Sequence, residues 1–139
     1  MLNELAKHHE DIERHVRAQE MLLLGSDRPS IEAVARARWK LMAASRRRRD
    51  YADDVIYPAL DAVLTGAHAE ALAALRARDM AQRQWASGHL GRWPIDRVTG
   101  EFDAYTVAAV EVFQRMRSYI ETERQVLMPL LSPLLARQG

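Results

Sequence analysis

Residues 46–60 read RRRRDYADDVIYPAL, in which four arginines precede an acidic pair, an apolar triplet and a proline. Residues 124–131 read RQVLMPLL and repeat the later part of that order: two polar residues, three apolar residues, proline, an apolar residue and leucine. Both prolines fall near the expected end of a helix, where a proline kinks the last turns. The two stretches therefore predict two helices that end in the same way.

Composition and chain breakers predict helix along almost the whole chain. Alanine, leucine, arginine and glutamate are frequent, and aromatic residues are only 6%, which favours helix. Turn signals lie at residues 25–30, at Thr65-Gly66 and at residues 91–100, and Ser30 or Asp27 can cap the second helix. We expect one domain over residues 1–139, all-α, with helices near 2–24, 30–64, 67–90 and 101–131 in an up-down-up-down four-helix bundle.

Charge and composition exclude several kinds of protein. The formal net charge of +1 creates no overall field for a nucleic acid, and four consecutive helical arginines turn through about 300° and cannot share one face. The absence of cysteine excludes disulfides, thiolate ligands and a cysteine nucleophile. No apolar run approaches the roughly 20 residues of a membrane span. We expect a soluble, cytoplasmic protein without a membrane partner, and a nucleic acid would need a local basic surface.

Apolar residues recur at steps of three and four and predict one inward face for each helix. Polar residues interrupt all four faces. We also expect the three tryptophans, Trp39, Trp85 and Trp93, to be packing anchors. The predicted inward residues are Leu2, Leu5, His9, Ile12, Val16, Gln19 and Leu23; Ile31, Val34, Arg38, Leu41, Ser45, Arg48, Ala52, Val55 and Ala59; Leu72, Leu75, Asp79, Gln82, Ala86 and His89; and Tyr105, Ala109, Val112, Met116, Tyr119, Glu123 and Val126.

The paired proline-ended helices, together with LAKHHEDI at residues 5–12 and RWP at residues 92–94, resemble the hemerythrin-like (HHE cation-binding) family. The resemblance implies a four-helix bundle whose second and fourth helices carry H-x-x-x-E, then an acidic residue, a short apolar run and proline. It also implies a metal centre, usually of two irons, held by histidines and carboxylates. Residues four apart share one helix face, so this spacing presents two ligands to one site.

Counting back ten and six residues from each proline carries the family's ligand positions onto this chain. Before Pro58 these positions are Arg48 and Ala52, and before Pro129 they are Tyr119 and Glu123. Arginine is a cation without a free lone pair and alanine has no donor atom, so Arg48, Ala52 and Tyr119 are degenerate ligand positions, although a tyrosinate can bind ferric iron. The residual metal candidates are His9 and Glu123, with His8, Asp79, Tyr119 and His89 as weaker ones.

This ligand set predicts a buried ion pair where the resemblance places the metal. We expect Arg48 to pair with Glu123, with Tyr119 or Asp79 bonded nearby, because by antiparallel register Asp79 lies level with Arg48. His89 lies about 15 Å further along the helix axis. Asp53 and Asp54 are expected near solvent, partnered by arginines, and His9 can equally be a core histidine bonded to a neighbour.

Three functional classes follow. The first is a hemerythrin-like module without its metal centre and without a cofactor, regulatory or protein-binding, with an unidentified protein partner or a homodimer as its assembly. The second is a non-haem protein with a reduced site, mono- or dinuclear in iron, for oxygen, nitric oxide or peroxide sensing or for iron handling. The third is a nucleic-acid-binding bundle that uses Arg46, Arg47 and Arg49, whose plainer interpretation is a solvated face. No phosphate loop, serine elbow or zincin motif occurs, so we expect no catalytic residues.

Overall fold

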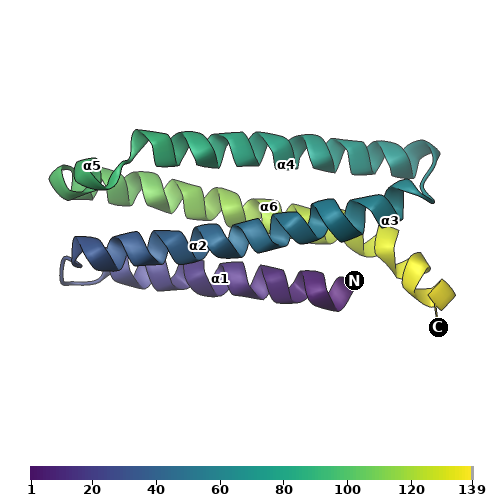
Figure 1. Cartoon of the computed structure of the whole chain (residues 1–139), viewed down its shortest axis with the longest axis horizontal. Coiled ribbons are helices and arrows are strands. Elements are labelled where there is room, and N and C mark those ends of the chain that lie inside the picture. The colour runs from purple at the N-terminus through teal and green to yellow at the C-terminus, as the bar shows by residue number, and fades with distance from the viewer. Residues whose placement is uncertain (139) are drawn as a thin grey trace.

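Helices make up nearly all of residues 1–138, the part of the chain that this computed structural model describes. The predicted all-α class is confirmed, and no strand occurs within these residues. Two further elements depart from the predicted set: a π-helical turn joins α2 to α3, and a short helix α5 precedes the last one (Figure 1). The elements are α1 Leu2–Leu24, α2 Ile31–Tyr51, the π-helical turn Ala52–Ile56, α3 Tyr57–Asp61, α4 Gly66–Arg92, α5 Ile95–Gly100 and α6 Phe102–Gln138.

Local chemistry explains where α2 and α4 begin. Ser30 Oγ accepts a hydrogen bond of 3.2 Å from the backbone N–H of Ala33, and so caps a free donor at the start of α2. Gly66 begins α4 with φ of 58°, a left-handed conformation that glycine adopts without a steric penalty. Both starts lie at the predicted chain breakers.

Two predicted boundaries were wrong at the end of the chain. The segment 91–100, predicted as a turn, contains α5, which begins directly after Pro94 and buries Val98 completely. The last helix does not end at residue 131 but continues through Pro129 and Pro133 to Gln138. A proline removes one backbone hydrogen bond and leaves the others, so it bends a packed helix without ending it. The C-terminal part of α6 turns away from the rest of that helix (Figure 1).

A π-helical turn interrupts the second long helix immediately before Pro58. The backbone N–H of Tyr57 bonds to the carbonyl of Ala52, five residues back, where an α-helix would use the residue four back. Proline lacks an N–H and its ring crowds the carbonyl four residues earlier. A wider turn at this point accommodates the ring and adds one residue to the helix.

The added residue shifts the inward face by one position beyond Ala52. Val55, predicted to face inward, is 40% exposed, while its neighbour Ile56 is completely buried. Tyr57 and Leu60 are buried in the same way, in place of the predicted Ala59, which is half-buried. The prediction was wrong here because it continued a 3.6-residue period through a turn that does not have it.

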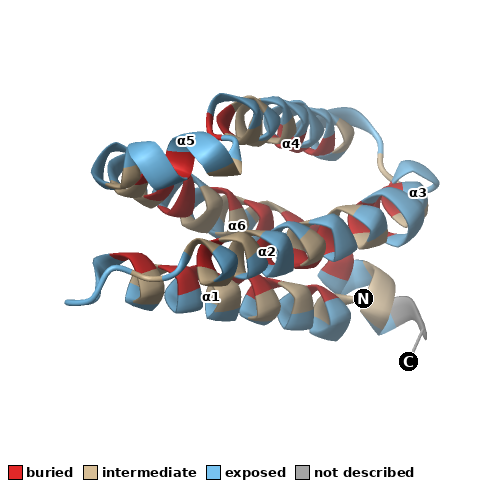
Figure 2. Cartoon of the chain, turned by 60° about the vertical axis from the view of Figure 1, so that its left-hand side comes forward, coloured by how far each residue is buried: buried red, intermediate tan, exposed pale blue. Residues whose placement is uncertain are grey.

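The long helices run alongside one another, with α1 packed against α2 and α6, and α4 packed against α6 (Figure 1). Between α2 and α4, close backbone approaches are few or lacking within residues 1–138. Figure 2 shows the buried residues on the sides of the helices that face each other. Charged side chains, described below, bridge α2 and α4 across the space where their backbones stay apart.

The apolar core has two parts. The α3-end cluster contains Leu5, Ala52, Ile56, Tyr57, Leu60, Leu72, Leu75, Tyr119, Leu127, Leu130 and Leu131. The α5-end cluster contains Ile12, Val16, Leu23, Val34, Leu41, Ala44, Trp93, Val98, Tyr105, Ala109 and Phe113. On α1 and α2, the buried polar residues His9 and Arg48 lie between the two clusters.

Some large apolar side chains remain at the surface. Trp39, predicted as a packing anchor, is 68% exposed, whereas Trp93 is buried in the α5-end cluster. Trp39 borders the open space between α2 and α4 and stays largely unpacked there, which periodicity alone does not reveal. Within residues 1–138, no helix combines the length and the apolar character needed to cross a membrane.

Candidate functional site

Arg48 reaches from the last turn of α2 into the centre of the molecule and is only 6% exposed. Its Nη1 donates a hydrogen bond of 2.6 Å to Glu123 Oε2 on α6, and its Nη2 donates one of 3.0 Å to Asp79 Oδ1 on α4. The guanidinium carbon also lies 5.2 Å from the centre of the Tyr119 ring. One planar cation thereby joins three helices, which suits the fixed fork of donors that arginine presents.

Glu123 is completely buried, and both of its carboxylate oxygens have a partner. Oε2 accepts from Arg48, and Oε1 lies 3.2 Å from Nε2 of His9, which is itself buried on α1. This distance allows a hydrogen bond from an Nε2–H of His9 to the carboxylate. A buried carboxylate is tolerated when it is paired and hydrogen-bonded in this way.

Asp79 forms the other half of the arrangement and continues it toward the surface. The hydroxyl of Tyr57 donates to Asp79 Oδ2 at 3.1 Å, and Arg83 Nη2 donates to the same oxygen at 2.8 Å. Arg83 then bonds both oxygens of Asp53 at 2.9 and 3.1 Å, where the network meets solvent. We call His9, Arg48, Tyr57, Asp79, Arg83 and Glu123 the polar layer.

The charges of the polar layer stabilise one another. Burial alone lowers the pKa of Arg48, but the negative charges of Glu123 and Asp79 outweigh it and raise that pKa above its usual range. Burial alone raises the pKa of Asp79, but Arg48 and Arg83 outweigh it and hold that pKa below its usual value. Arg48 and Asp79 therefore stay ionised at neutral pH.

The two tyrosines next to these charges stay neutral. Burial raises the pKa of Tyr57, and the negative charge of Asp79 raises it further. Burial likewise raises the pKa of Tyr119, and Glu123 adds to the effect. Both side chains are therefore protonated phenols at neutral pH, and neither supplies a tyrosinate.

These donors do not fit a di-iron centre. Among the described residues, no three histidine, aspartate or glutamate side chains come together so that they could hold a metal ion. The guanidinium of Arg48 lies between the carboxylates of Glu123 and Asp79 and bonds to both. Ala52 offers no donor. A cation at this point opposes the charge of a metal, so we derive no chemistry through iron.

No protein-family model, curated protein or solved structure matches this chain. The likeness to hemerythrin-like proteins therefore remains a resemblance, carried by the sequence motifs quoted above.

Of the remaining metal candidates, Tyr119 lies beside the Arg48 guanidinium, whereas His8 and His89 lie apart from it. His8 Nε2 lies 3.3 Å from Glu4 Oε1 on the side of α1, one turn away along the same helix. His89 packs in the opposite part of the molecule, with its ring centre 6.1 Å from that of Tyr105. Burial, and then the positive charge of Arg38, lower the pKa of His89 to about 4, so this imidazole is neutral. The polar layer thus includes His9, Asp79 and Glu123 from the predicted set, and neither His8 nor His89.

Sequence reasoning missed two members of the polar layer. Arg83 follows Asp79 by four residues on α4, which is the spacing of a helical ion pair and was an available signal. Tyr57 faces inward because of the π-helical turn, and a regular helical period gives no sign of this. Asp53 lies near solvent and pairs with an arginine, in line with its expected place.

Proposed function

We propose that this chain is a hemerythrin-like, up-down-up-down four-helix bundle that has lost its di-iron centre and acts as a non-catalytic regulatory or protein-interaction module. One observation carries the proposal: Arg48, at an inferred histidine position, bonds both Glu123 and Asp79. A metal ion would neutralise these carboxylates in a di-iron protein, and here the Arg48 guanidinium neutralises them.

The electrostatics of the polar layer explain how such a bundle folds without metal. Several carboxylates that point inward repel one another unless a cation lies between them. Arg48 supplies that cation on a side chain, and its two hydrogen bonds connect α2 to α4 and α6. The bundle therefore keeps buried acidic residues and has no need of a bound ion to balance them.

The arrangement of the helices supports the bundle. The four long segments alternate in direction along the chain, and α5 lies within the connection from α4 to α6 (Figure 1). The packing of α1 on α2 and α6, and of α4 on α6, is that of neighbouring antiparallel helices.

Exposed apolar side chains on α1 and α2 support the interaction role. Trp39 is 68% exposed and Met42, one helical turn further along α2, is 48% exposed. Met21 on the neighbouring helix α1 is 79% exposed. Exposed tryptophan and methionine side chains are typical of surfaces that bind other proteins.

The alternative function, a reduced iron site, depends on His9 and Glu123, the donors that lie 3.2 Å apart. Metal analysis separates the two functions. The protein is expressed in iron-supplemented medium, purified without chelators and analysed for metal by mass spectrometry. We expect iron far below one atom per chain and no charge-transfer absorption, whereas near-stoichiometric iron with an oxo-bridged absorption band overturns the metal-free function.

A further inference from the structure

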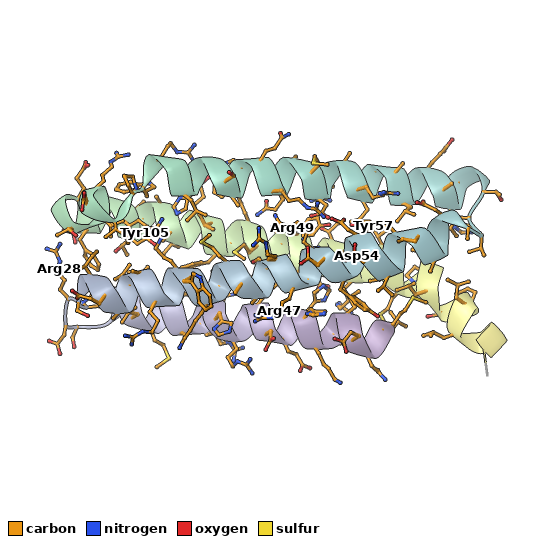
Figure 3. All side chains as sticks on the ribbon, viewed as in Figure 1. Arg28, Arg47, Arg49, Asp54, Tyr57 and Tyr105 are labelled. Carbon is orange, nitrogen blue, oxygen red and sulfur yellow. The ribbon has the colours of Figure 1, made fainter. Side chains whose placement is uncertain are left out.

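A cavity of about 580 Å³ lies between α2, α4 and α6, on the α5 side of Arg48. It exists because α2 and α4 are not closely packed there, and most of its lining is apolar. Arg49 and Tyr105 both line this cavity, and Figure 3 labels both side chains between α2 and α4. A volume of this size is typical of sites for small molecules.

Unpartnered polar groups gather in this cavity. Among the described residues, every buried side-chain nitrogen or oxygen without a hydrogen-bond partner belongs to a lining residue: Arg38 Nη1, Ser45 Oγ, Gln82 Nε2 and the hydroxyl of Tyr119. Tyr119 is only 6% exposed. Native proteins rarely leave buried donors unpaired, so these four atoms are available to bond the polar groups of a molecule that enters the cavity.

The charge of the lining selects an anion. Arg38, Arg48 and Arg49 line the α2 side of the cavity, Arg46 and Arg47 border it as exposed residues, and Arg83 lines the α4 side; the two acidic residues of the lining are Asp50 and Asp79. Arg48 and Arg83 are neutralised by Asp79 and its neighbours. Arg38 makes no ion pair with any described residue, and its guanidinium lies 5.5 Å from the ring centre of Tyr105. It is a half-buried cation without a counter-ion.

Helix register gives the layout of the polar groups. Ser45, Gln82 and Tyr119 each lie one helical turn from a member of the polar layer, on the side toward α5. Arg38 precedes Ser45 by seven residues, which is about 10 Å along the helix axis. The cavity thus has a cation at one end, hydrogen-bonding groups at the other, and apolar side chains such as Leu41, Ala86 and Val112 among its walls.

We propose that this cavity binds a small amphipathic carboxylate, with the carboxylate on Arg38, an apolar chain between α2, α4 and α6, and a hydroxyl or carbonyl group near Ser45, Gln82 and Tyr119. This proposal rests on the proposed regulatory function and names the class of ligand that would regulate the protein. Iron content and carboxylate binding are separate measurements, so either can fail alone.

Calorimetry with three probes of equal chain length tests the ligand class. Decanoate and ω-hydroxydecanoate are titrated into the intact protein below their micelle concentrations, and decanol below its solubility limit. We expect saturable binding of both carboxylates, with ω-hydroxydecanoate the tighter, and about ten-fold weaker binding of the uncharged decanol, the effect of one charged hydrogen bond. No saturable binding of either carboxylate to the folded wild-type protein overturns the proposal.

Matched variants test the placement. Arg38→Met should weaken both carboxylates about ten-fold and leave decanol unchanged, while Arg36→Met, an exposed arginine of α2 outside the cavity, should change nothing. Ala86→Phe, which fills the cavity, should weaken all three probes. If Arg38→Met fails to fold, Arg38→Lys takes its place in the binding measurements, because lysine keeps the positive charge. Equal weakening by Arg36→Met and Arg38→Met overturns the proposal, because it shows binding to general positive charge.

Discussion

Arg48 Nη1 lies 2.6 Å from Glu123 Oε2, and the two side chains are 6% and 0% exposed. The same guanidinium bonds Asp79 on a third helix. A buried pair of this kind contributes little over apolar packing when it is intact, but leaves an uncompensated charge when one partner is removed. Arg48 is therefore a side chain whose loss the fold tolerates poorly.

Removal of either partner should destabilise the protein strongly. We expect Arg48→Met and Glu123→Gln each to lower the free energy of unfolding by about 3–5 kcal/mol, which is a fall of roughly 10–20 °C in melting temperature for a domain of this size. Circular dichroism during thermal and urea unfolding measures both quantities.

Arg46→Met provides the control, because Arg46 belongs to the same arginine run but is exposed. Its effect should stay within about 0.5 kcal/mol. If Arg48→Met and Glu123→Gln unfold at the wild-type temperature, the buried pair does not exist in solution.

The π-helical turn predicts opposite outcomes for two adjacent residues. Ile56 is completely buried, so Ile56→Ala should cost about 2–5 kcal/mol. Val55 is 40% exposed, so Val55→Ala should stay within about 0.5 kcal/mol. Urea unfolding of both variants makes the comparison. A regular helix through this segment would bury Val55 in place of Ile56, and the reversed order of the two effects would rule out the π-helical turn.

His89 makes stability depend on pH between about 6.5 and 4. Its pKa is lowered from 6.5 to about 4, first by burial and then by Arg38 and Arg92, so the unfolded chain binds the proton more readily. Stability is therefore full above pH 6.5 and falls as the pH drops toward 4, by at most about 3 kcal/mol. Urea unfolding at a series of pH values measures the slope.

His89→Gln should flatten this pH profile, because glutamine keeps a polar side chain that does not titrate. His68→Gln, at an exposed position of the same helix, should leave the profile as it is in the wild type. A profile that His89→Gln leaves unchanged would mean that His89 is not buried in solution. Asp79 affects stability in a separate pH range. Its pKa in the folded protein lies below 3.8, so the stability that its ionised form contributes is lost only as the pH falls below about 3.8.

The polar layer shows what a sequence can predict and why. The hemerythrin-like resemblance, counted ten and six residues back from each proline, pointed to Arg48 and Glu123, and helical spacing placed both on inward faces. The two side chains do meet, and Asp79 meets Arg48 at the level that antiparallel register gives. Arg48, Asp79 and Glu123 each lie in a regular part of a helix, so the inward face predicted for each of those helices placed them correctly.

Other features depend on tertiary context. The π-helical turn before Pro58 turned Tyr57 inward, and no local propensity distinguishes it from an ordinary proline kink. The cavity arises from the separation of α2 and α4, which is a property of helix packing. The four arginines of residues 46–49 therefore take different places, which the sequence alone does not show. Arg48 belongs to the polar layer, while Arg47 lies toward α1 and Arg49 toward the cavity (Figure 3).

Restoring the inferred ligands should restore metal binding. Arg48→His with Ala52→Glu supplies an imidazole at the end of α2 and a carboxylate four residues later, at the first residue of the π-helical turn. Tyr119→His adds a further imidazole on α6. We expect iron occupancy to rise in the folded double variant and to rise again in the triple variant.

The most direct measurement is the iron content per chain of the wild-type protein and of Arg48→His/Ala52→Glu, expressed and purified side by side in iron-supplemented medium. If Arg48 stands in the place of the metal, the wild-type protein contains almost no iron and the folded double variant contains clearly more. Near-stoichiometric iron in the wild type, or no gain in a correctly folded double variant, contradicts the account.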